Sequence, residues 1–162
     1  MAVLKLATLE DTRNFGALLA RLLPSSGVRA LLLRGGLGSG KTTLTAALVR
    51  ALPGGGEAEV ASPSFTLCNI YPTHPPLVHC DLYRSPGRAP EELLDALDAA
   101  DTLVAVEWAD SLDPAVLPDD FLDISLKMVD DGRLLLLNGA GPLGMALAGE
   151  LARALERGPS LP

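Results

Sequence analysis

A glycine-rich segment, G-G-L-G-S-G-K-T at residues 35–42, constrains this chain more than any other feature of its sequence. It matches the pattern G-x-x-x-x-G-K-[ST], in which glycines let successive backbone amides turn towards phosphate oxygens. An apolar run at 30–33 precedes the segment, and residues 42–52 have the composition of a helix. A buried strand, a tight turn and a helix in this order predict the phosphate-binding loop (P-loop) of a nucleotide-binding α/β protein.

The polar positions of the motif have separate expected contacts. Lys41 would bring a full positive charge to the outer phosphates, and Thr42 would place its hydroxyl on Mg²⁺. The other residues that we expect to bind the nucleotide here are Gly36, Leu37, Gly38, Ser39, Gly40 and Thr43.

A P-loop also needs a carboxylate for the metal or its water shell, usually at the end of a nearby apolar strand. Two segments end that way: L-V-A-V at 103–106 runs into Glu107, and L-V-H-C at 77–80 runs into Asp81. Glu107 ends the more apolar segment and is therefore the first candidate. His79 shares a strand face with Asp81 because the two are two residues apart. We expect His79 to pack or to form a hydrogen bond rather than to bind a metal.

Three further features leave alternatives open. The loop S-P-S-F-T at 62–66 carries hydroxyls that could reach a γ-phosphate, as in switch loops, or it is simply a loop turned by Pro63. Trp108, the only tryptophan, follows Glu107 and belongs either to the core or to the nucleotide site. The arginines nearest these loops contact either phosphate or solvent; they are Arg34, Arg84 and Arg88.

Composition limits the class of protein. A length of 162 residues predicts one domain, 1–162, and 48% apolar residues suffice for a packed core. No apolar run approaches the roughly 20 residues of a membrane helix. A net charge of −7 with few aromatic residues is unfavourable for stand-alone binding of nucleic acid.

The two cysteines, Cys68 and Cys80, form no C-x-x-C pair. We therefore expect neither a zinc module nor a disulfide: Cys80 would be a buried thiol, and Cys68 would have no companion. Such usage is typical of a reducing, cytoplasmic location.

Hydrophobic patterning predicts strands alternating with helices in the first two thirds of the chain, followed by a hairpin with a D-D-G turn at 130–132. This order predicts an α/β sandwich with a mixed sheet. The first expected helix begins at Thr8, whose side chain can cap its first turn. Three more helices are expected at 42–52, 90–97 and 144–156. The expected strands span 30–33, 65–71, 77–81, 103–106, 121–129 and 133–137.

Together these segments resemble the TsaE family (also called YjeE), the small ATPase of bacterial tRNA threonylcarbamoyladenosine (t6A) biosynthesis. Four motifs in the same order make this resemblance more specific than a P-loop alone. They are G-L-G-S-G-K-T-T at 36–43, S-P-S-F-T-L at 62–67, H-C-D-L-Y-R at 79–84 and E-W at 107–108. The resemblance implies a P-loop NTPase-like three-layer α/β sandwich with a mixed, roughly seven-stranded sheet.

The resemblance also implies roles for individual residues. ATP and Mg²⁺ would bind at the P-loop, with Thr42 and Glu107 on the metal and Trp108 near the nucleotide. Lys41 and Asp81 would serve hydrolysis, the latter by ordering the attacking water. Thr66 would act with them as part of a switch-like loop.

Partners follow from the same resemblance. The family acts with the TsaB and TsaD proteins, and TsaD transfers threonylcarbamoyl to adenosine 37 of tRNA. The ATPase, weak by itself, resets that pair between turnovers and would contact tRNA only indirectly and membranes not at all. The chain departs from the family at Gly36, where an acidic residue is usual, at Ser64, where Thr is usual, and in the short segment 91–102.

Other functions compete with this interpretation. A small-molecule kinase would need an acceptor site and an arginine-bearing lid, and no lid insertion is evident in the sequence. A GTPase would show the motif N-K-x-D, which the sequence lacks. A nucleotide-responsive assembly factor with little turnover would carry the same P-loop as an ATPase.

Overall fold

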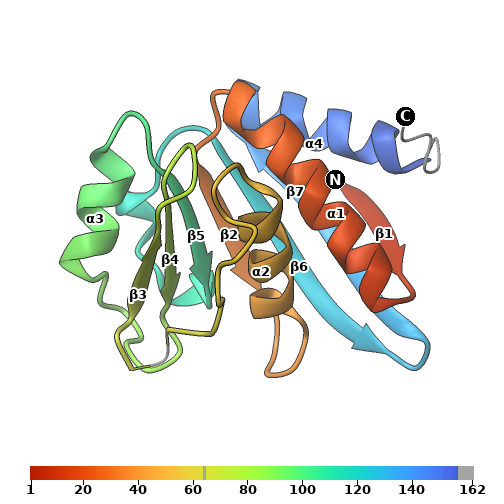
Figure 1. Cartoon of the computed structure of the whole chain (residues 1–162), viewed down its shortest axis with the longest axis horizontal. Helices are drawn as coiled ribbons and strands as arrows, with labels where there is room; N and C mark the ends of the chain where they lie inside the picture. Colours follow the sequence, from red (N-terminus) through yellow and green to blue (C-terminus); the bar gives the residue numbers. More distant parts are fainter. Residues whose placement is uncertain (64, 157–162) are drawn as a thin grey trace.

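A single seven-stranded sheet runs through the computed structural model, which describes residues 1–63 and 65–156 (Figure 1). The strand order is β1-β7-β6-β2-β5-β4-β3. The four central strands β6, β2, β5 and β4 are mutually parallel, whereas β7, β1 and β3 pair antiparallel at the two sides. The strands are β1 (Ala2–Leu6), β2 (Ala30–Arg34), β3 (Cys68–Tyr71), β4 (Leu77–Asp81), β5 (Leu103–Glu107), β6 (Phe121–Val129) and β7 (Gly132–Ala140).

Helices cover both faces of the sheet, so that the molecule has three layers. Helices α1 (Leu9–Leu22), α2 (Lys41–Ala51) and α4 (Gly141–Glu156) pack on one face through aliphatic side chains. Helix α3 (Glu91–Asp98) and two short 3₁₀ turns at 109–111 and 114–116 cover the other face. The predicted α/β sandwich with a mixed sheet is confirmed.

The local signals at the first helix are also confirmed. The hydroxyl of Thr8 accepts a hydrogen bond from the amide of Asp11 at 3.1 Å, and the Asp11 carboxylate accepts one from the amide of Thr8 at 2.8 Å. This reciprocal capping box satisfies two amides that the helix itself leaves unpaired. Helix α1 then approaches α2 closely at Gly16, where a Cβ atom would lie only 2.4 Å from that of Ala47.

Differences from the predicted elements concentrate at the sides of the sheet. Strand β3 is shorter than predicted because residues 65–67 form a turn before Cys68. Strand β1 has no counterpart among the predicted strands; it is short, half exposed and pairs only with β7. Its residues Ala2, Leu4 and Leu6 alternate towards the core, while Val3 and Lys5 are exposed.

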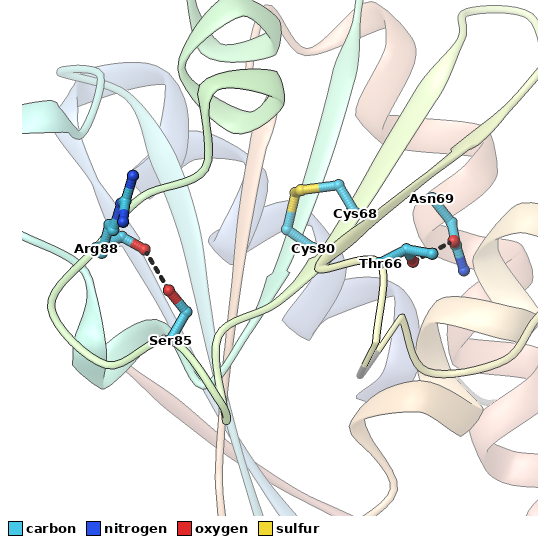
Figure 2. Close-up of a disulfide and its surroundings, with 6 residues drawn as sticks. All are labelled: Thr66, Cys68, Asn69, Cys80, Ser85 and Arg88. Atoms are coloured by element: carbon cyan, nitrogen blue, oxygen red, sulfur yellow. Dashed lines mark hydrogen bonds between the residues drawn. A yellow bond between two sulfur atoms is a disulfide. The ribbon is translucent and has the colours of Figure 1, made fainter.

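The expectation for the cysteines is wrong: Cys68 and Cys80 form a disulfide (Figure 2). Strands β3 and β4 pair antiparallel in a register that sets these two residues directly opposite each other, with their Cα atoms 4.1 Å apart. Register is a tertiary property, which a spacing of 12 residues does not reveal. The pairing also removes the argument for a reducing location that rested on free thiols.

Within residues 1–63 and 65–156, no helix combines the length and the apolar character that spanning a bilayer requires.

Candidate functional site

The P-loop lies between the end of β2 and the start of α2. Gly40 caps the helix in a left-handed conformation with φ of 105°, so the first amides of α2 face the loop. A Cβ atom at Gly35, whose φ is 132°, would lie 2.2 Å from the carbonyl oxygen of Leu126. Only glycine fits there. At Gly36, by contrast, a Cβ atom would meet nothing within 4 Å, so a side chain could start at this position without a clash.

Lys41 is buried at the centre of this loop, although lysine is almost never buried without partners. Its ammonium donates to the carbonyl oxygens of Gly35 at 2.7 Å and Gly36 at 2.9 Å, and it lies 4.1 Å from the centre of the Trp108 ring. Burial lowers the pKa of the Lys41 ammonium, while the charge of Glu107 opposes that shift. The loop therefore holds a cation in a cradle of amides suited to phosphate.

Thr42 and Glu107 meet at the wall of the site. The hydroxyl of Thr42 donates to Glu107 Oε2 at 3.0 Å, and Glu107 Oε1 lies 2.8 Å from His79 Nε2. Glu107 is only 2% exposed because it ends β5, the strand beside β2 in the middle of the sheet. The predicted hydrogen-bonding role of His79 is confirmed.

Asp81 ends the next strand and lies beside Glu107 in the parallel register of β4 and β5. Its Oδ1 accepts the backbone amide of Tyr83 at 2.9 Å, and its Oδ2 accepts the hydroxyl of Ser62. The amide of Asp81 donates to the carbonyl oxygen of Leu67 at 2.9 Å. These contacts orient the carboxylate and connect it to the polar loop 62–67.

One open pocket of about 360 Å³ brings the P-loop and both carboxylates together. It lies at the carboxyl ends of the parallel strands, where open α/β sheets bind ligands. The residues that line it are Leu37, Gly38, Gly40, Lys41, Thr42, Thr43, Ser62, Asp81, Tyr83, Glu107 and Trp108.

The donor set suits a hydrated Mg²⁺ ion that is shared with a nucleotide. A threonine hydroxyl and buried carboxylates are hard oxygen donors, which Mg²⁺ prefers. In the part of the chain that the structure describes, no group of three or more His, Cys, Asp or Glu side chains could hold a metal by itself. Mg²⁺ usually takes one or two carboxylates from a protein and completes its shell with water and phosphate oxygens.

Trp108 stands at the pocket in an uncommon backbone conformation. Its φ of 59° is left-handed, which is rare for a bulky side chain and typical of functional sites. Its ring contacts the Lys41 ammonium and lies 4.8 Å from the ring of Tyr83. Trp108 both lines the pocket and packs against the buried cluster beneath α3, so each of the two interpretations of this residue keeps a supporting contact.

Other predicted residues lie away from the pocket. Thr66 is exposed and donates its hydroxyl to Asn69 at 3.0 Å (Figure 2), and Ser64 lies outside the described residues. The Arg34 guanidinium forms ion pairs with Asp110 and Asp123.

The side chain of Arg84 also contacts a protein group, whereas the contact found for Arg88 involves its backbone. The Arg84 guanidinium stacks 4.7 Å from the ring of Phe65. The Arg88 carbonyl oxygen accepts the hydroxyl of Ser85 at 3.2 Å, as Figure 2 shows.

Two contacts at the site escaped the sequence analysis. Arg133, at the start of β7, donates its Nε to the carbonyl oxygen of Ser39 at 2.9 Å and lies against Gly40. Tyr83 adds an exposed ring beside Trp108. The hairpin of β6 and β7 reaches the P-loop only because β6 pairs with β2, and no local signal in the sequence indicates that pairing.

Comparison with known proteins gives a consistent result. The family model described as "Threonylcarbamoyl adenosine biosynthesis protein TsaE" matches residues 6–135. A "tRNA threonylcarbamoyladenosine biosynthesis protein TsaE" from Aquifex aeolicus is 38% identical over 123 residues, covering 74% of this chain and 87% of that protein. The protein of the same name from Nostoc sp. is 34% identical over 141 residues, covering 82% of both chains. The crystal structure of YdiB from Bacillus subtilis superposes with a TM-score of 0.73 at 27% identity, covering 94% of this chain and 95% of that one.

Proposed function

Because the chain belongs to the TsaE family of threonylcarbamoyl adenosine biosynthesis proteins, we propose that it binds ATP with Mg²⁺ and hydrolyses it in the service of t6A formation. One observation carries this proposal. A P-loop lysine, the threonine that follows it and two buried carboxylates from neighbouring strands line the same pocket.

Binding depends mainly on the P-loop in this proposal. The amides at the start of α2 and the Lys41 ammonium hold the β- and γ-phosphates. Thr42 and Glu107 hold the metal side of the nucleotide. A Mg²⁺ ion held by these two residues would supply neutralisation of the negative charge on the phosphates. The remaining P-loop residues that line the pocket contact the nucleotide through their backbone.

Hydrolysis depends on Asp81. Its carboxylate orients the attacking water, and the Ser62 hydroxyl and the Tyr83 amide fix the carboxylate in turn. The loop 62–66 acts as a switch that responds to the γ-phosphate. Thr66 belongs to this loop, and its contribution requires the loop to move from the conformation in which Thr66 donates to Asn69.

Partners complete the proposal. The chain works in the cytoplasm with TsaB and TsaD, and its hydrolysis, weak alone, resets that pair. Contact with tRNA is indirect: the net charge of −7 offers little attraction to a phosphate backbone, so tight tRNA binding by the isolated chain would contradict this assignment.

The test is steady-state ATP hydrolysis, with and without the TsaB and TsaD proteins. We expect partner-dependent turnover that Glu107→Ala abolishes in the presence of Mg²⁺, because the variant removes the carboxylate at the metal side. The exposed Glu150→Ala serves as the matched control and should behave as the unchanged protein. Normal Mg²⁺ dependence in Glu107→Ala would overturn the metal assignment.

A second measurement separates an ATPase from an assembly factor. If partner binding responds to ATP while hydrolysis stays at the background rate, the chain is a nucleotide-responsive assembly factor. Loss of t6A from tRNA in cells that lack the protein would tie either activity to the pathway.

A further inference from the structure

A buried histidine lies behind Glu107, the carboxylate that we propose to bind Mg²⁺, and the proposed mechanism gives this histidine no role. His79 occupies the middle of β4, two residues before Asp81, and is fully buried. Its Nε2 lies 2.8 Å from Oε1 of Glu107. An ionised carboxylate only accepts hydrogen bonds, so the contact with an ionised Glu107 requires the histidine tautomer that carries its proton on Nε2.

The two oxygens of Glu107 therefore have different partners. Oε1 faces His79 in the core, while Oε2 accepts the hydroxyl of Thr42 at the pocket. A carboxylate held at one oxygen cannot rotate freely, so the histidine fixes the plane of the Glu107 carboxylate and the direction in which its other oxygen points. Thr42, Glu107 and His79 thus form a chain of hydrogen bonds from the P-loop into the core.

Among the described residues, the histidine ring has no hydrogen-bond partner other than Glu107. Its Nδ1 atom is buried and has no hydrogen-bond partner among the described residues. The ring stacks at 6.4 Å on Tyr71, whose own hydroxyl is buried without a partner in the same range. A purely packing side chain would fill this place without leaving a buried polar atom unpaired, which is unfavourable.

We propose that His79 is a positioning residue for Mg²⁺: it holds the Glu107 carboxylate so that Oε2 stays turned towards Thr42 and the metal. The inference rests on the proposed role of Glu107 at the metal. It predicts that His79 affects the coupling between Mg²⁺ and ATP rather than the binding of ATP itself. That coupling is the ratio of the ATP dissociation constants measured with EDTA and with Mg²⁺.

The test is titration calorimetry of ATP in both conditions on a set of variants. His79→Leu removes the hydrogen-bond donor and replaces the imidazole with an apolar side chain of similar size. We expect it to lower the coupling ratio at least fivefold while ATP affinity in EDTA changes less than twofold. An unchanged ratio would overturn the proposal, whether ATP affinity stays the same in both conditions or falls equally in both. An equal fall is what a merely structural role produces.

A second pair of variants keeps the test decisive if His79→Leu does not fold. His79→Gln places an amide N–H near the former Nε2 position, whereas His79→Asn places one near Nδ1. We expect Gln to retain at least half of the coupling ratio and Asn to behave as Leu. Equal ratios in the two variants would overturn the proposal.

Glu107→Gln distinguishes this inference from the proposed function. If Glu107→Gln lowers the coupling and the His79 variants do not, only the inference fails. If Glu107→Gln also leaves the coupling unchanged, the metal assignment in the proposed function fails, and the role of His79 fails with it.

Discussion

The nucleotide pocket has two walls that are built in opposite ways. One wall is the P-loop, a continuous stretch at 35–43 whose backbone is set by its own glycines and by the start of α2. The other wall is assembled from Ser62, Asp81 and Tyr83. These residues reach the pocket through a loop, a strand end and a turn.

The second wall is held by long-range contacts. Asp81 is placed beside Glu107 by the register of β4 on β5, and the Cys68–Cys80 disulfide fixes β3, which follows the polar loop, to β4. The first wall depends mostly on contacts that are local in the chain, with Arg133 as a long-range partner of Ser39, whereas the second wall requires correct strand pairing throughout. We therefore expect changes in the first wall to affect binding and changes in the second to affect stability and turnover.

The largest expected effect comes from the disulfide. Reduction by a dithiol opens a loop of 12 residues and should lower the free energy of unfolding by roughly 3 kcal/mol, since the unfolded chain regains entropy. For a domain of this size the melting temperature should fall by about 6 to 12 °C. Thermal unfolding followed by circular dichroism measures it.

The matched control is the double variant Cys68→Ala with Cys80→Ala, whose melting temperature should not respond to the dithiol. ATP affinity at 25 °C should change less than about twofold on reduction, because the P-loop wall keeps its local structure. A large loss of affinity would show that the two walls are not separable.

Removing the P-loop cation tests the first wall. Lys41→Ala should weaken ATP binding at least tenfold, about 1.4 kcal/mol, because the cradle of amides then faces the phosphates without its full positive charge. Calorimetry measures the change. The exposed Lys127→Ala removes the same charge elsewhere and should bind as the unchanged protein. Equal affinities in all three proteins would contradict the assignment.

Removing the carboxylate of the second wall should separate binding from turnover. Asp81→Ala should keep ATP affinity within about twofold and slow partner-stimulated hydrolysis roughly tenfold or more, since the attacking water loses its orienting group. Asp130→Ala, at the exposed turn between β6 and β7, is the control. A variant that binds ATP poorly but turns over normally would reverse the proposed division between the walls.

The smallest expected effect is optical. Trp108 contacts the Lys41 ammonium at 4.1 Å, so Mg-ATP should change the surroundings of the indole. We expect a saturable change in tryptophan fluorescence that is lost in Lys41→Ala. A flat titration at concentrations where calorimetry detects binding would separate Trp108 from the nucleotide site.

The first wall was predictable from sequence, and the second only in part. The P-loop, α2, β4 and β6 appear where the patterns predicted them, because glycine conformations, helix caps and strand alternation are local properties. Glu107 and Asp81 were found as strand ends. Their distances to Thr42, Ser62 and His79 could not be derived, since those contacts depend on strand order and register.

The errors have the same origin. The disulfide was missed because opposite positions in β3 and β4 arise from pairing and not from spacing along the chain. Arg133 was missed because it reaches Ser39 through the pairing of β6 with β2. Strand β1 was missed although Ala2, Leu4 and Leu6 alternate towards the core, because a strand of 5 residues gives only a short pattern and its pairing with β7 is a tertiary property.

The sequence by itself determined the phosphate-binding loop, the order of most elements and the residue types available for Mg²⁺ and water. Those properties follow from backbone conformation and periodicity over a few residues. Only the tertiary structure decided that one oxygen of Glu107 meets Thr42, that His79 holds the other oxygen, and that two cysteines meet across β3 and β4. Side-chain partners across a sheet are fixed by strand register, which burial of the whole core selects.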